Sequence, residues 1–326
     1  MLIDKFHRAH NYLRISLTNH CNMRCFYCMP AEDYEMTPSS ELMQVDEIEA
    51  LAKIFVSLGV NKIRLTGGEP LVRKDVSQII HSLSQLPVSL TLTTNGVRLH
   101  EFLPAIKRAG IGALNISLDT LNANKFEQIT RRNNFERVWN NIHAAIQEGI
   151  HVKVNIVVMK GVNDEEIGDF VEWTKNTPVH VRFIEFMPFS GNQWNGMKVF
   201  SLKEILQKVE AGYHFIKLKD ELNDTTKKYM VPGHKGTFAV ISTMTAPFCS
   251  NCNRIRLTAD GKIRNCLFAK EETDLLAALR NKENVEALIQ QNIMRKHASH
   301  GGQFGGDIQR VEPGSIHNRS MIGIGG

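Results

Sequence analysis

The sequence predicts an α/β protein, built as a partial (β/α)6 barrel of the TIM type with a C-terminal α+β extension. Short apolar segments alternate with amphipathic segments between residues 12 and 187, which indicates βαβ units and a parallel sheet. Glycine, threonine and serine gather where the apolar segments end, as expected for a site at the C-terminal rim of a barrel. The composition changes after residue 220, which indicates where the extension begins.

The expected elements follow the spacing of apolar residues. An apolar run at 12–17 is followed by a helix expected over 46–58, which ends at Gly59, a residue suited to the C-cap. The other expected strands span 61–66, 89–94, 113–118, 152–159 and 181–187, and the other expected helices span 71–84, 101–109, 135–148 and 164–175. Two flat doubly wound halves are the alternative, but no G-x-G-x-x-G follows the first strand.

The last third of the chain has a different pattern. Ser201 and Glu204 form a capping box, which begins a helix that runs to residue 209. The segment 219–236 is polar and contains glycine and proline, so we place the domain boundary there. This divides the chain into a core, residues 1–220, and an extension, residues 221–326.

The extension begins with a strand expected over 237–244. Asp260-Gly261 lies between two apolar runs and predicts a hairpin. A two-residue turn there pairs Ile255 with Cys266 and gathers the nearby cysteines at the open end of the hairpin. A helical pattern covers 273–294, and the glycine-rich tail 315–326 is expected to be unstructured on its own.

The chain has 326 residues, of which 42% are hydrophobic and 22% are charged, so its size and composition are those of an ordinary globular protein. The N-terminus has no apolar signal region and no long uncharged apolar run occurs, so we expect neither a signal peptide nor a membrane span, and a cytoplasmic location. The net charge of +5 is spread along the chain, which suits a small polyanionic substrate better than a nucleic acid.

All six cysteines fall into two triplets: C-x3-C-x2-C at Cys21, Cys25 and Cys28, and C-x2-C-x13-C at Cys249, Cys252 and Cys266. Disulfide frameworks are typical of short secreted chains, whereas grouped thiols in a long chain favour metal centres in a reducing compartment. Four cysteines fill the four irons of a cubane cluster. Three leave one iron open, and an open position distinguishes a catalytic metal site from a structural one.

Zinc is the alternative for both triplets. The first triplet could use His20 as a fourth ligand, although adjacent histidine and cysteine side chains rarely reach one tetrahedral ion. The second triplet with its hairpin also fits a zinc ribbon, which needs a fourth ligand. No seventh cysteine exists, and His234, His297 and His300 are remote in sequence but stay open as ligands.

Several cations lie in or beside strands that are otherwise apolar: Arg14, Lys62, Arg64, Lys153 and Arg182. A buried strand cation is costly without a partner, so several together indicate a bound anion. The alternative is that each pairs with a nearby carboxylate at the rim or surface. Arg254 and Arg256 share one face of the hairpin at a spacing that suits phosphates, and no phosphate-binding G-x-x-x-x-G-K-[ST] loop occurs.

Gly67-Gly68-Glu69-Pro70 follows an expected strand. Glycines there let a ligand approach the backbone closely, and a plain βα turn is the alternative. Thr93 and Ser117 fall at the ends of the next two strands, so we expect these two residues and the glycine segment to lie on one rim of the barrel.

Together these motifs resemble the radical S-adenosylmethionine (SAM) enzymes and, among them, the GTP 3′,8-cyclases of molybdenum cofactor biosynthesis. The resemblance runs from Tyr12 to Gly326. It rests on Tyr12-Leu13-Arg14, the first cysteine triplet, the segment 64–70, Thr93-Thr94-Asn95-Gly96, the segments 152–155 and 182–187, the second triplet with Asn253-Arg254-Ile255-Arg256, and the terminal Ile324-Gly325-Gly326.

The resemblance implies two [4Fe–4S] clusters, one on each cysteine triplet. SAM would bind the first cluster and contact Tyr27, Gly68, Ser117 and Met187, and the second cluster would face the guanine. GTP would be held by Arg14, Arg64, Thr93, Lys153, Arg254, Ile255 and Arg256, with help from Lys62 and Arg182. The first triplet, Arg254 and Arg256 carry the implied catalytic roles, and the terminal glycines would reach into the active site.

The resemblance also implies a lyase reaction. A 5′-deoxyadenosyl radical would take the ribose 3′ hydrogen, and the C3′ radical would add to C8 of guanine. The product, 3′,8-cyclo-7,8-dihydroguanosine 5′-triphosphate, would pass to a downstream cyclic pyranopterin monophosphate synthase. An electron donor would be needed, no nucleic acid or membrane is involved, and the enzyme would be a monomer or homodimer.

Two other functions are compatible with parts of the pattern. One is a radical SAM enzyme that modifies a peptide and uses the second cluster as an electron relay, but such chains usually carry a longer, more cysteine-rich C-terminal domain. The other is a non-enzymatic zinc or iron–sulfur scaffold, which the metal content of the protein would distinguish.

Overall fold

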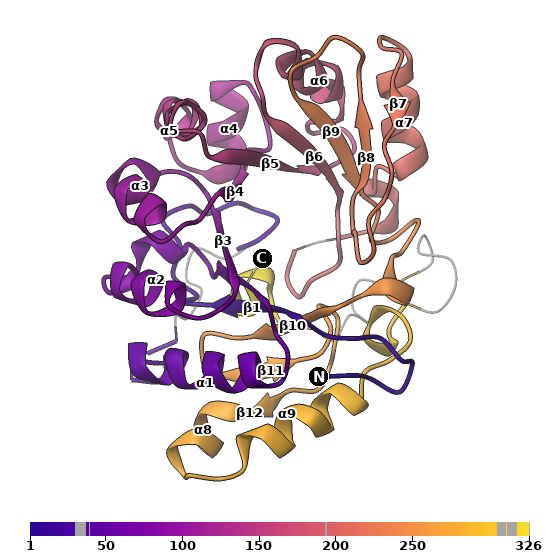
Figure 1. Cartoon of the computed structure of the whole chain (residues 1–326). Helices are drawn as coiled ribbons and strands as arrows, with labels where there is room; N and C mark the ends of the chain where they lie inside the picture. Colours follow the sequence, from indigo (N-terminus) through magenta and orange to yellow (C-terminus); the bar gives the residue numbers. More distant parts are fainter. Residues whose placement is uncertain (30–36, 39, 193, 305–310, 312–317, 326) are drawn as a thin grey trace.

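The structure is a computed structural model, which describes residues 1–29, 37–38, 40–192, 194–304, 311 and 318–325. One twelve-stranded sheet has the order β12-β11-β10-β1-β2-β3-β4-β5-β6-β9-β8-β7. The strands from β10 to β9 in that order run parallel to one another, and the strands at both edges are antiparallel. The sheet curves but does not close, so the expected partial barrel is confirmed (Figure 1).

The βα units form the main part of the barrel. Their strands are β1 (Tyr12–Ser16), β2 (Lys62–Thr66), β3 (Ser89–Thr94), β4 (Ala113–Ser117), β5 (His151–Val158) and β6 (His180–Glu185). Their helices, on the outside of the sheet in Figure 1, are α1 (Val45–Ser57), α2 (Val76–Ser84), α3 (Leu99–Arg108), α4 (Ala123–Thr130), α5 (Phe135–Gln147) and α6 (Ile167–Asn176). The expected strands and helices of this part are therefore found, with α4 as an addition.

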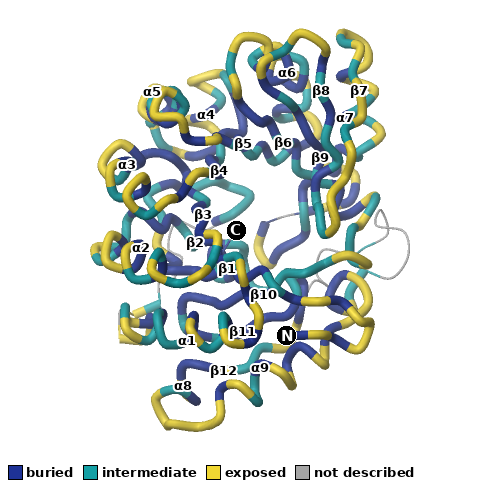
Figure 2. Tube along the Cα trace, in the orientation of Figure 1, coloured by how far each residue is buried: buried dark blue, intermediate teal, exposed yellow. Residues whose placement is uncertain are grey.

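Alternation along the strands separates the core from the barrel interior. In β5, Val152 and Val154 are buried against the helices, whereas Lys153 and Asn155 between them are only partly buried and face the interior. On the helix side, Ile48, Leu51 and Phe55 of α1 are fully buried in the same core. Figure 2 shows the result, with buried strands inside and exposed helix faces outside.

The helix expected over 71–84 begins later than expected. A 3-10 turn, η1 (Pro70–Val72), comes first, and Arg73 is extended before α2. The Arg73 guanidinium donates to the Asp75 carboxylate at 2.6 Å and to the carbonyls of Leu17 and Met43, each at 2.7 Å. These bonds tie the start of α2 to the segments around it, which a propensity argument does not detect.

The C-terminal part of the chain adds strands to both edges of the barrel sheet. At one edge, β9 (Thr237–Ile241) pairs with β6, followed by β8 (Lys227–Met230) and β7 (Ile216–Lys217). At the other edge, β10 (Arg254–Leu257) pairs with β1, followed by β11 (Lys262–Arg264) and β12 (Thr273–Asp274). The remaining elements are η2 (Asp164–Glu166), η3 (Gly196–Lys198), α7 (Leu202–Glu210), η4 (Cys249–Asn251), α8 (Leu275–Arg280), α9 (Val285–Met294), η5 (His300–Gly302) and α10 (Met321–Ile324). The expected capping box of Ser201 and Glu204 begins α7.

The hairpin exists, but its expected register is wrong. Arg256 pairs with Arg264, so Ile255 does not pair with Cys266. The turn contains three residues because Thr258 and Lys262 close it, with a Thr258 N–H to Lys262 carbonyl bond of 3.0 Å. Gly261 occupies the left-handed position that such turns require, at φ 72°.

Two further expectations at the C-terminal end are also corrected. The helix expected over 273–294 is split into α8 and α9, because Lys282 adopts a positive φ between them and Asn284 caps α9. The tail is not wholly unstructured, since α10 buries Ile322 and Ile324. Residues 315–317 and 326 of the tail lie outside the described residues. Among the described residues, no helix has both the length and the apolar character needed to cross a membrane.

We expect Gly261→Ala to destabilise the chain more than Gly110→Ala. Both glycines have a positive φ, 72° and 68°, so both substitutions lose about 1 kcal/mol through backbone strain. A Cβ at Gly261 would also lie 2.3 Å from the Cβ of Leu276, whereas nothing lies within 4 Å at Gly110. The clash adds on the order of 1–3 kcal/mol in denaturant unfolding. Equal losses in the two variants would contradict this account of the turn.

Candidate active site

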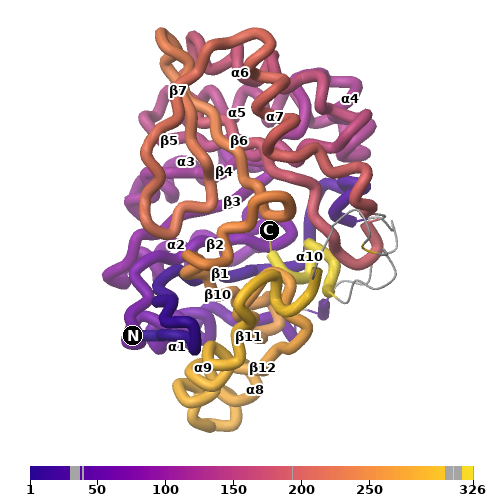
Figure 3. Tube along the Cα trace, turned by 90° about the vertical axis from the view of Figure 1, so that its right-hand side faces the viewer, coloured from indigo at the N-terminus to yellow at the C-terminus, as the bar shows by residue number. Residues whose placement is uncertain are grey.

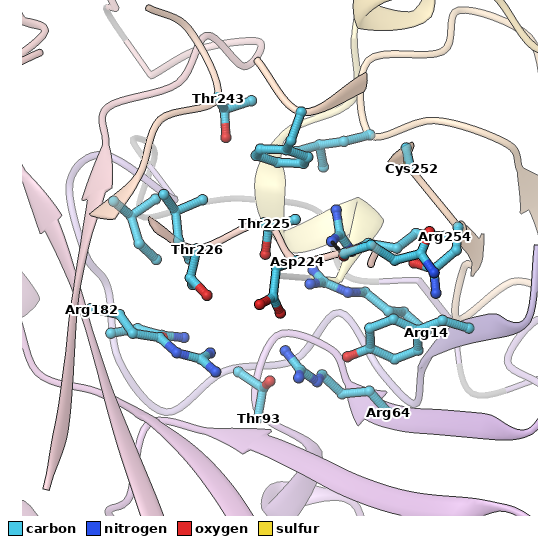
Figure 4. A pocket seen from close by; sticks show the side chains of 18 of the residues that line it. Arg14, Arg64, Thr93, Arg182, Asp224, Thr225, Thr226, Thr243, Cys252 and Arg254 are labelled. Carbon is cyan, nitrogen blue, oxygen red and sulfur yellow. Dashed lines mark hydrogen bonds between the residues drawn. The ribbon is translucent and has the colours of Figure 1, made fainter. Parts of the chain in front are cut away.

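The barrel interior holds a cavity of about 590 Å³ whose wall is strongly cationic (Figure 4). Its cationic lining residues are Arg14, Lys62, Arg64, Lys153, Arg182, Lys228, Arg254 and Arg256. Thr93 and Met187 also line it. The structure thus brings together the expected substrate-binding residues, except Ile255, which is fully buried in the core between its two arginine neighbours.

Strand register explains this convergence. β1 aligns Arg14 with Arg64 of β2 on one side and with Arg256 of β10 on the other, so the three arginines form one row. A second row, one pleat away on the same face, contains Tyr12, Lys62 and Arg254. Positions two apart on a strand face the same side, and both rows therefore face the cavity.

The positive charge of this wall is largely uncompensated. Among the described residues, the expected strand cations make no ion pair with a carboxylate, so the alternative of individual pairing is not supported. The buried Nε atoms of Arg14 and Arg182 and the Oγ1 of Thr93 also lack hydrogen-bond partners. Polar atoms in such a position require a ligand or water, and the charge selects an anion.

The pKa values of the cations show the same mutual repulsion. Burial, followed by the charges of Arg182 and Lys62, lowers the pKa of Lys153 to about 8. Burial also lowers the pKa of Arg64 to about 9, and the positive charges of Arg14 and Arg182 contribute. A polyanion in the cavity would relieve this repulsion, since an opposite charge favours the protonated form of each cation.

Sequence analysis missed several residues of the cavity wall. Asp224, Thr225 and Thr226 come from the loop between β7 and β8, within the polar segment interpreted as a domain boundary. Asp224 is the one carboxylate among the described lining residues, and it pairs with Lys228 at 2.7 Å. A polar loop gives no local signal for such a role, because only the fold brings it to the cavity.

The first cysteine triplet lies in the loop that follows β1. The backbone N–H groups of Cys28 and Met29 donate to the Cys25 carbonyl at 3.0 and 2.9 Å, which curls the loop. Burial, the neighbouring thiols and nearby carboxylates raise the pKa values of all three thiols, to about 11 for Cys21 and about 12 for Cys28. A bound metal centre would replace these protons.

The Gly67-Gly68-Glu69 segment packs directly against this loop. A Cβ at Gly67 would lie 2.6 Å from the Thr18 carbonyl oxygen, and one at Gly68 would lie 2.4 Å from that of His20. The Glu69 carboxylate, buried so that its pKa rises to about 7, accepts from Thr94 Oγ1 at 2.7 Å and from the Asn95 N–H at 2.6 Å. The two glycines therefore permit close contact between two backbone segments of the chain itself. Together with the bonds of Glu69, this contact fixes the cysteine loop against the ends of β2 and β3.

The four residues expected to contact SAM lie at or beyond strand ends on the same rim: Tyr27 in the cysteine loop after β1, Gly68 after β2, Ser117 at the end of β4 and Met187 after β6. Sequence analysis missed Asp119, which accepts from the Tyr27 hydroxyl at 2.6 Å and from the Val157 N–H at 2.9 Å. Burial raises the pKa of Asp119 to about 6. Asp119 thus holds Tyr27 against the barrel.

The second triplet opens onto the cationic cavity, since Cys249, Cys252 and Cys266 all line it. Burial opposes ionisation of Cys252, but the charges of Lys296 and Arg254 lower the pKa of its thiol to about 7. All six cysteines are free, and three thiolates per triplet are the ligand type that iron–sulfur clusters use.

The zinc alternatives gain no support from the geometry. Within the described ranges, no three His, Cys, Asp or Glu side chains are arranged to hold a single metal ion. His234 contacts Thr174 at 2.9 Å, and His300 contacts the Thr243 carbonyl at 2.8 Å. His297 lies beside Gly302, and its carbonyl accepts from Arg8.

An apolar cluster connects the two cysteine loops. Phe26 and Tyr27 from the first loop and Cys266 and Leu267 from the second pack against a cluster that includes Ile324 of α10. Gly325, the residue that follows α10 (labelled in Figure 3), lies against Ser16 and Thr66 at the ends of β1 and β2, and its carbonyl accepts a bond from Arg256. The tail therefore reaches the site, as expected.

We expect His180, which lines the cavity, to make stability depend on pH. Burial and the charges of Arg182 and Lys153 lower its pKa to about 2, whereas an unfolded histidine titrates at about 6.5. The folded chain binds fewer protons, so this contribution to stability is present above a pH of about 6.5 and is lost as the pH falls below it.

His180→Asn should therefore remove on the order of 1–3 kcal/mol of the destabilisation that occurs on acidification. Denaturant unfolding between neutral and mildly acidic pH measures the difference. His214→Asn, at an exposed position, serves as the control. An unchanged pH dependence in His180→Asn would show that His180 is not held neutral by the cavity.

Comparison with known proteins supports the resemblance to radical SAM enzymes that the sequence motifs indicate. Residues 15–174 match the Radical SAM superfamily, and residues 179–302 match Molybdenum Cofactor Synthesis C. The crystal structure of SuiB from Streptococcus suis bound to S-adenosylmethionine superimposes with a TM-score of 0.56 over 86% of this chain and 68% of that one. At 14% identity, that likeness shows the fold alone.

Relatives align over the whole chain. The mitochondrial GTP 3′,8-cyclase of Arabidopsis thaliana is 50% identical over 100% of this chain and 84% of its own length. GTP 3′,8-cyclase of Desulforamulus reducens is 38% identical over the full length of both. Human molybdenum cofactor biosynthesis protein 1 is 46% identical over 98% of this chain, which spans 50% of the human protein. The chain belongs to the GTP 3′,8-cyclase family of radical SAM enzymes, whose relatives act in molybdenum cofactor biosynthesis.

Proposed function

We propose that this chain converts GTP into 3′,8-cyclo-7,8-dihydroguanosine 5′-triphosphate, the first step of molybdenum cofactor biosynthesis. The observation that carries the proposal is the uncompensated cationic cavity, onto which the second cysteine triplet opens. A triphosphate matches this charge, whereas a peptide without several acidic residues would not. The fit of the three-thiol sets supports two [4Fe–4S] clusters, held by Cys21, Cys25 and Cys28 and by Cys249, Cys252 and Cys266.

When bound, the first cluster and SAM would supply the radical chemistry for removal of the ribose 3′ hydrogen. The chain's own residues hold the partners in place. The Arg14, Arg64 and Arg256 row would bind the phosphates, because guanidinium groups donate paired hydrogen bonds to phosphate oxygens. Lys153 and Arg182 would add charge from the opposite strands, β5 and β6.

Water exclusion is the second contribution of the protein. The apolar cluster around Ile324 lies between the cysteine loops and would protect a carbon radical from solvent and from competing hydrogen donors. Glu69, in the turn after β2, would fix that turn through its bonds to Thr94 and Asn95 at the end of β3. Asp119 would orient Tyr27 toward SAM.

The division of labour follows the proposed domains. Residues 1–220 would provide radical formation, and residues 221–326 would provide Arg254, Arg256 and the second cluster. The reaction needs a one-electron donor, and its product would pass to a cyclic pyranopterin monophosphate synthase.

The function is tested by anaerobic incubation of the reconstituted chain with SAM, a reductant and GTP deuterated at the ribose 3′ carbon. We expect the cyclised nucleotide together with deuterium in 5′-deoxyadenosine. Cys25→Ala should abolish both, because it breaks the three-thiolate set. Deuterium that stays in the nucleotide, or products that persist in Cys25→Ala, would contradict the proposed reaction.

We expect Asp224→Asn to tighten GTP binding. Asp224 adds a negative charge to the wall that receives the triphosphate and pairs with Lys228, so its removal frees a cation and relieves repulsion. At a partly buried site the gain should be about 3- to 30-fold in the dissociation constant, measured by calorimetry.

Asp220→Asn is the matched control, because Asp220 lies in the same loop, is exposed and pairs with Lys217 at 2.5 Å outside the cavity wall. The affinity of the Asp220→Asn variant for GTP should equal that of the parent chain. Weaker GTP binding by Asp224→Asn would instead indicate that the carboxylate holds a metal ion on the phosphates.

A further inference from the structure

Lys296 is a buried cation beside the second cysteine triplet. The residue lies just after α9 and is 2% exposed. Its ammonium donates to Cys252 Sγ at 3.5 Å and to the Arg254 carbonyl at 3.1 Å. Within the part of the chain that the structure describes, no carboxylate forms an ion pair with it. A buried ammonium is costly without a counter-charge, so the nearby thiolates must supply it.

The surroundings fix this ammonium in place. The Lys296 N–H donates to the Ile293 carbonyl at 3.1 Å, which ends α9. The next carbonyls, of His297 and Ala298, each accept from the Arg8 guanidinium at 2.8 Å. Arg8 also donates to the Cys249 carbonyl at 2.7 Å, so one side chain ties the lysine segment to the cysteine loop.

The charge of Arg8 does not add to that of Lys296. Asp4 accepts from Arg8 Nε at 2.6 Å, and both side chains are buried. The Asp4–Arg8 ion pair is therefore nearly neutral, and its role is to hold the Lys296 segment against the cysteine loop. Lys296 is therefore a buried cation, without an ion pair among the described residues, that donates to a sulfur of this triplet, and Arg254 adds a second positive charge near the same sulfur.

The first triplet has the opposite electrostatic environment. Two buried carboxylates, Glu69 and Asp119, raise the pKa of its thiols, and the charge of Arg24 opposes this only at Cys21 and is the last of the causes there. Asn95 donates to Cys21 Sγ at 3.7 Å, but it is neutral. Hydrogen bonds to ligand sulfurs and local charge set the potential of an iron–sulfur cluster, so two equal ligand sets should differ in potential here.

We propose that Lys296 is a positioning residue for the second iron–sulfur cluster, whose ammonium donates to the Cys252 sulfur and raises the reduction potential of that cluster. Reduction adds negative charge to the cluster, and a fixed positive charge with a hydrogen bond to the ligand sulfur favours the reduced state. This inference rests on the proposed second cluster.

The test uses the full-length chain in which Cys21, Cys25 and Cys28 are replaced by alanine, so that only the second triplet can hold a cluster. After anaerobic reconstitution, redox titration followed by electron paramagnetic resonance gives the potential of that cluster. Lys296→Gln, close in length but uncharged, and Lys296→Met are compared with Lys296→Arg, which keeps the charge. Lys203→Met, at an exposed position on α7, is the control.

We expect a lower potential in Lys296→Gln and Lys296→Met, a potential close to the parent in Lys296→Arg, and no shift in Lys203→Met. A merely structural role would not order the variants by charge. A cluster that loads normally in Lys296→Gln with an unchanged potential would overturn the role of Lys296 alone. If the parent with three alanines binds no iron and sulfide at the second triplet, the two-cluster proposal falls, and this inference falls with it.

Discussion

The structure depends on the register of its parallel strands. Because β1 pairs with β2 and β10 so that Arg14, Arg64 and Arg256 stand side by side, the barrel interior gathers like charges with which no carboxylate of the described residues forms an ion pair. The apolar side chains on the opposite face of the same strands are buried under the helices, and the free energy of their burial offsets this repulsion. A slip of one residue would exchange the two faces and destroy core and cavity together.

Closure of the site depends on segments far apart in the sequence. The cysteine loop after β1, the glycine turn after β2 and the C-terminal tail meet where the first two strands end. The tail fills this place with Ile324 and Gly325, and the C-terminal strands extend both edges of the sheet around the cavity. The two cysteine triplets are thereby linked through one apolar cluster, while each keeps its own electrostatic environment.

Much of this arrangement could be predicted from the sequence, because strand alternation, thiol spacing and strand cations are local signals. Lys153 and Arg182 could be identified since they interrupt apolar strands, and their convergence followed from the barrel. Asp224 and Lys296 could not, because nothing in their neighbourhoods marks a polar loop or a helix end as part of a site. The hairpin register was wrong because Asp260-Gly261 suits two turn lengths, and the contact of Thr258 with Lys262 decides between them.

The central claim is that the cationic cavity binds the triphosphate of a guanine nucleotide. Calorimetric titration of the anaerobic, iron-loaded chain with GTP, GDP, GMP and guanosine tests it most directly. Affinity should fall stepwise as phosphates are removed, because each one meets buried arginines, such as Arg64 and Arg256, that make no ion pair among the described residues. Equal affinity for GTP and guanosine would contradict the account.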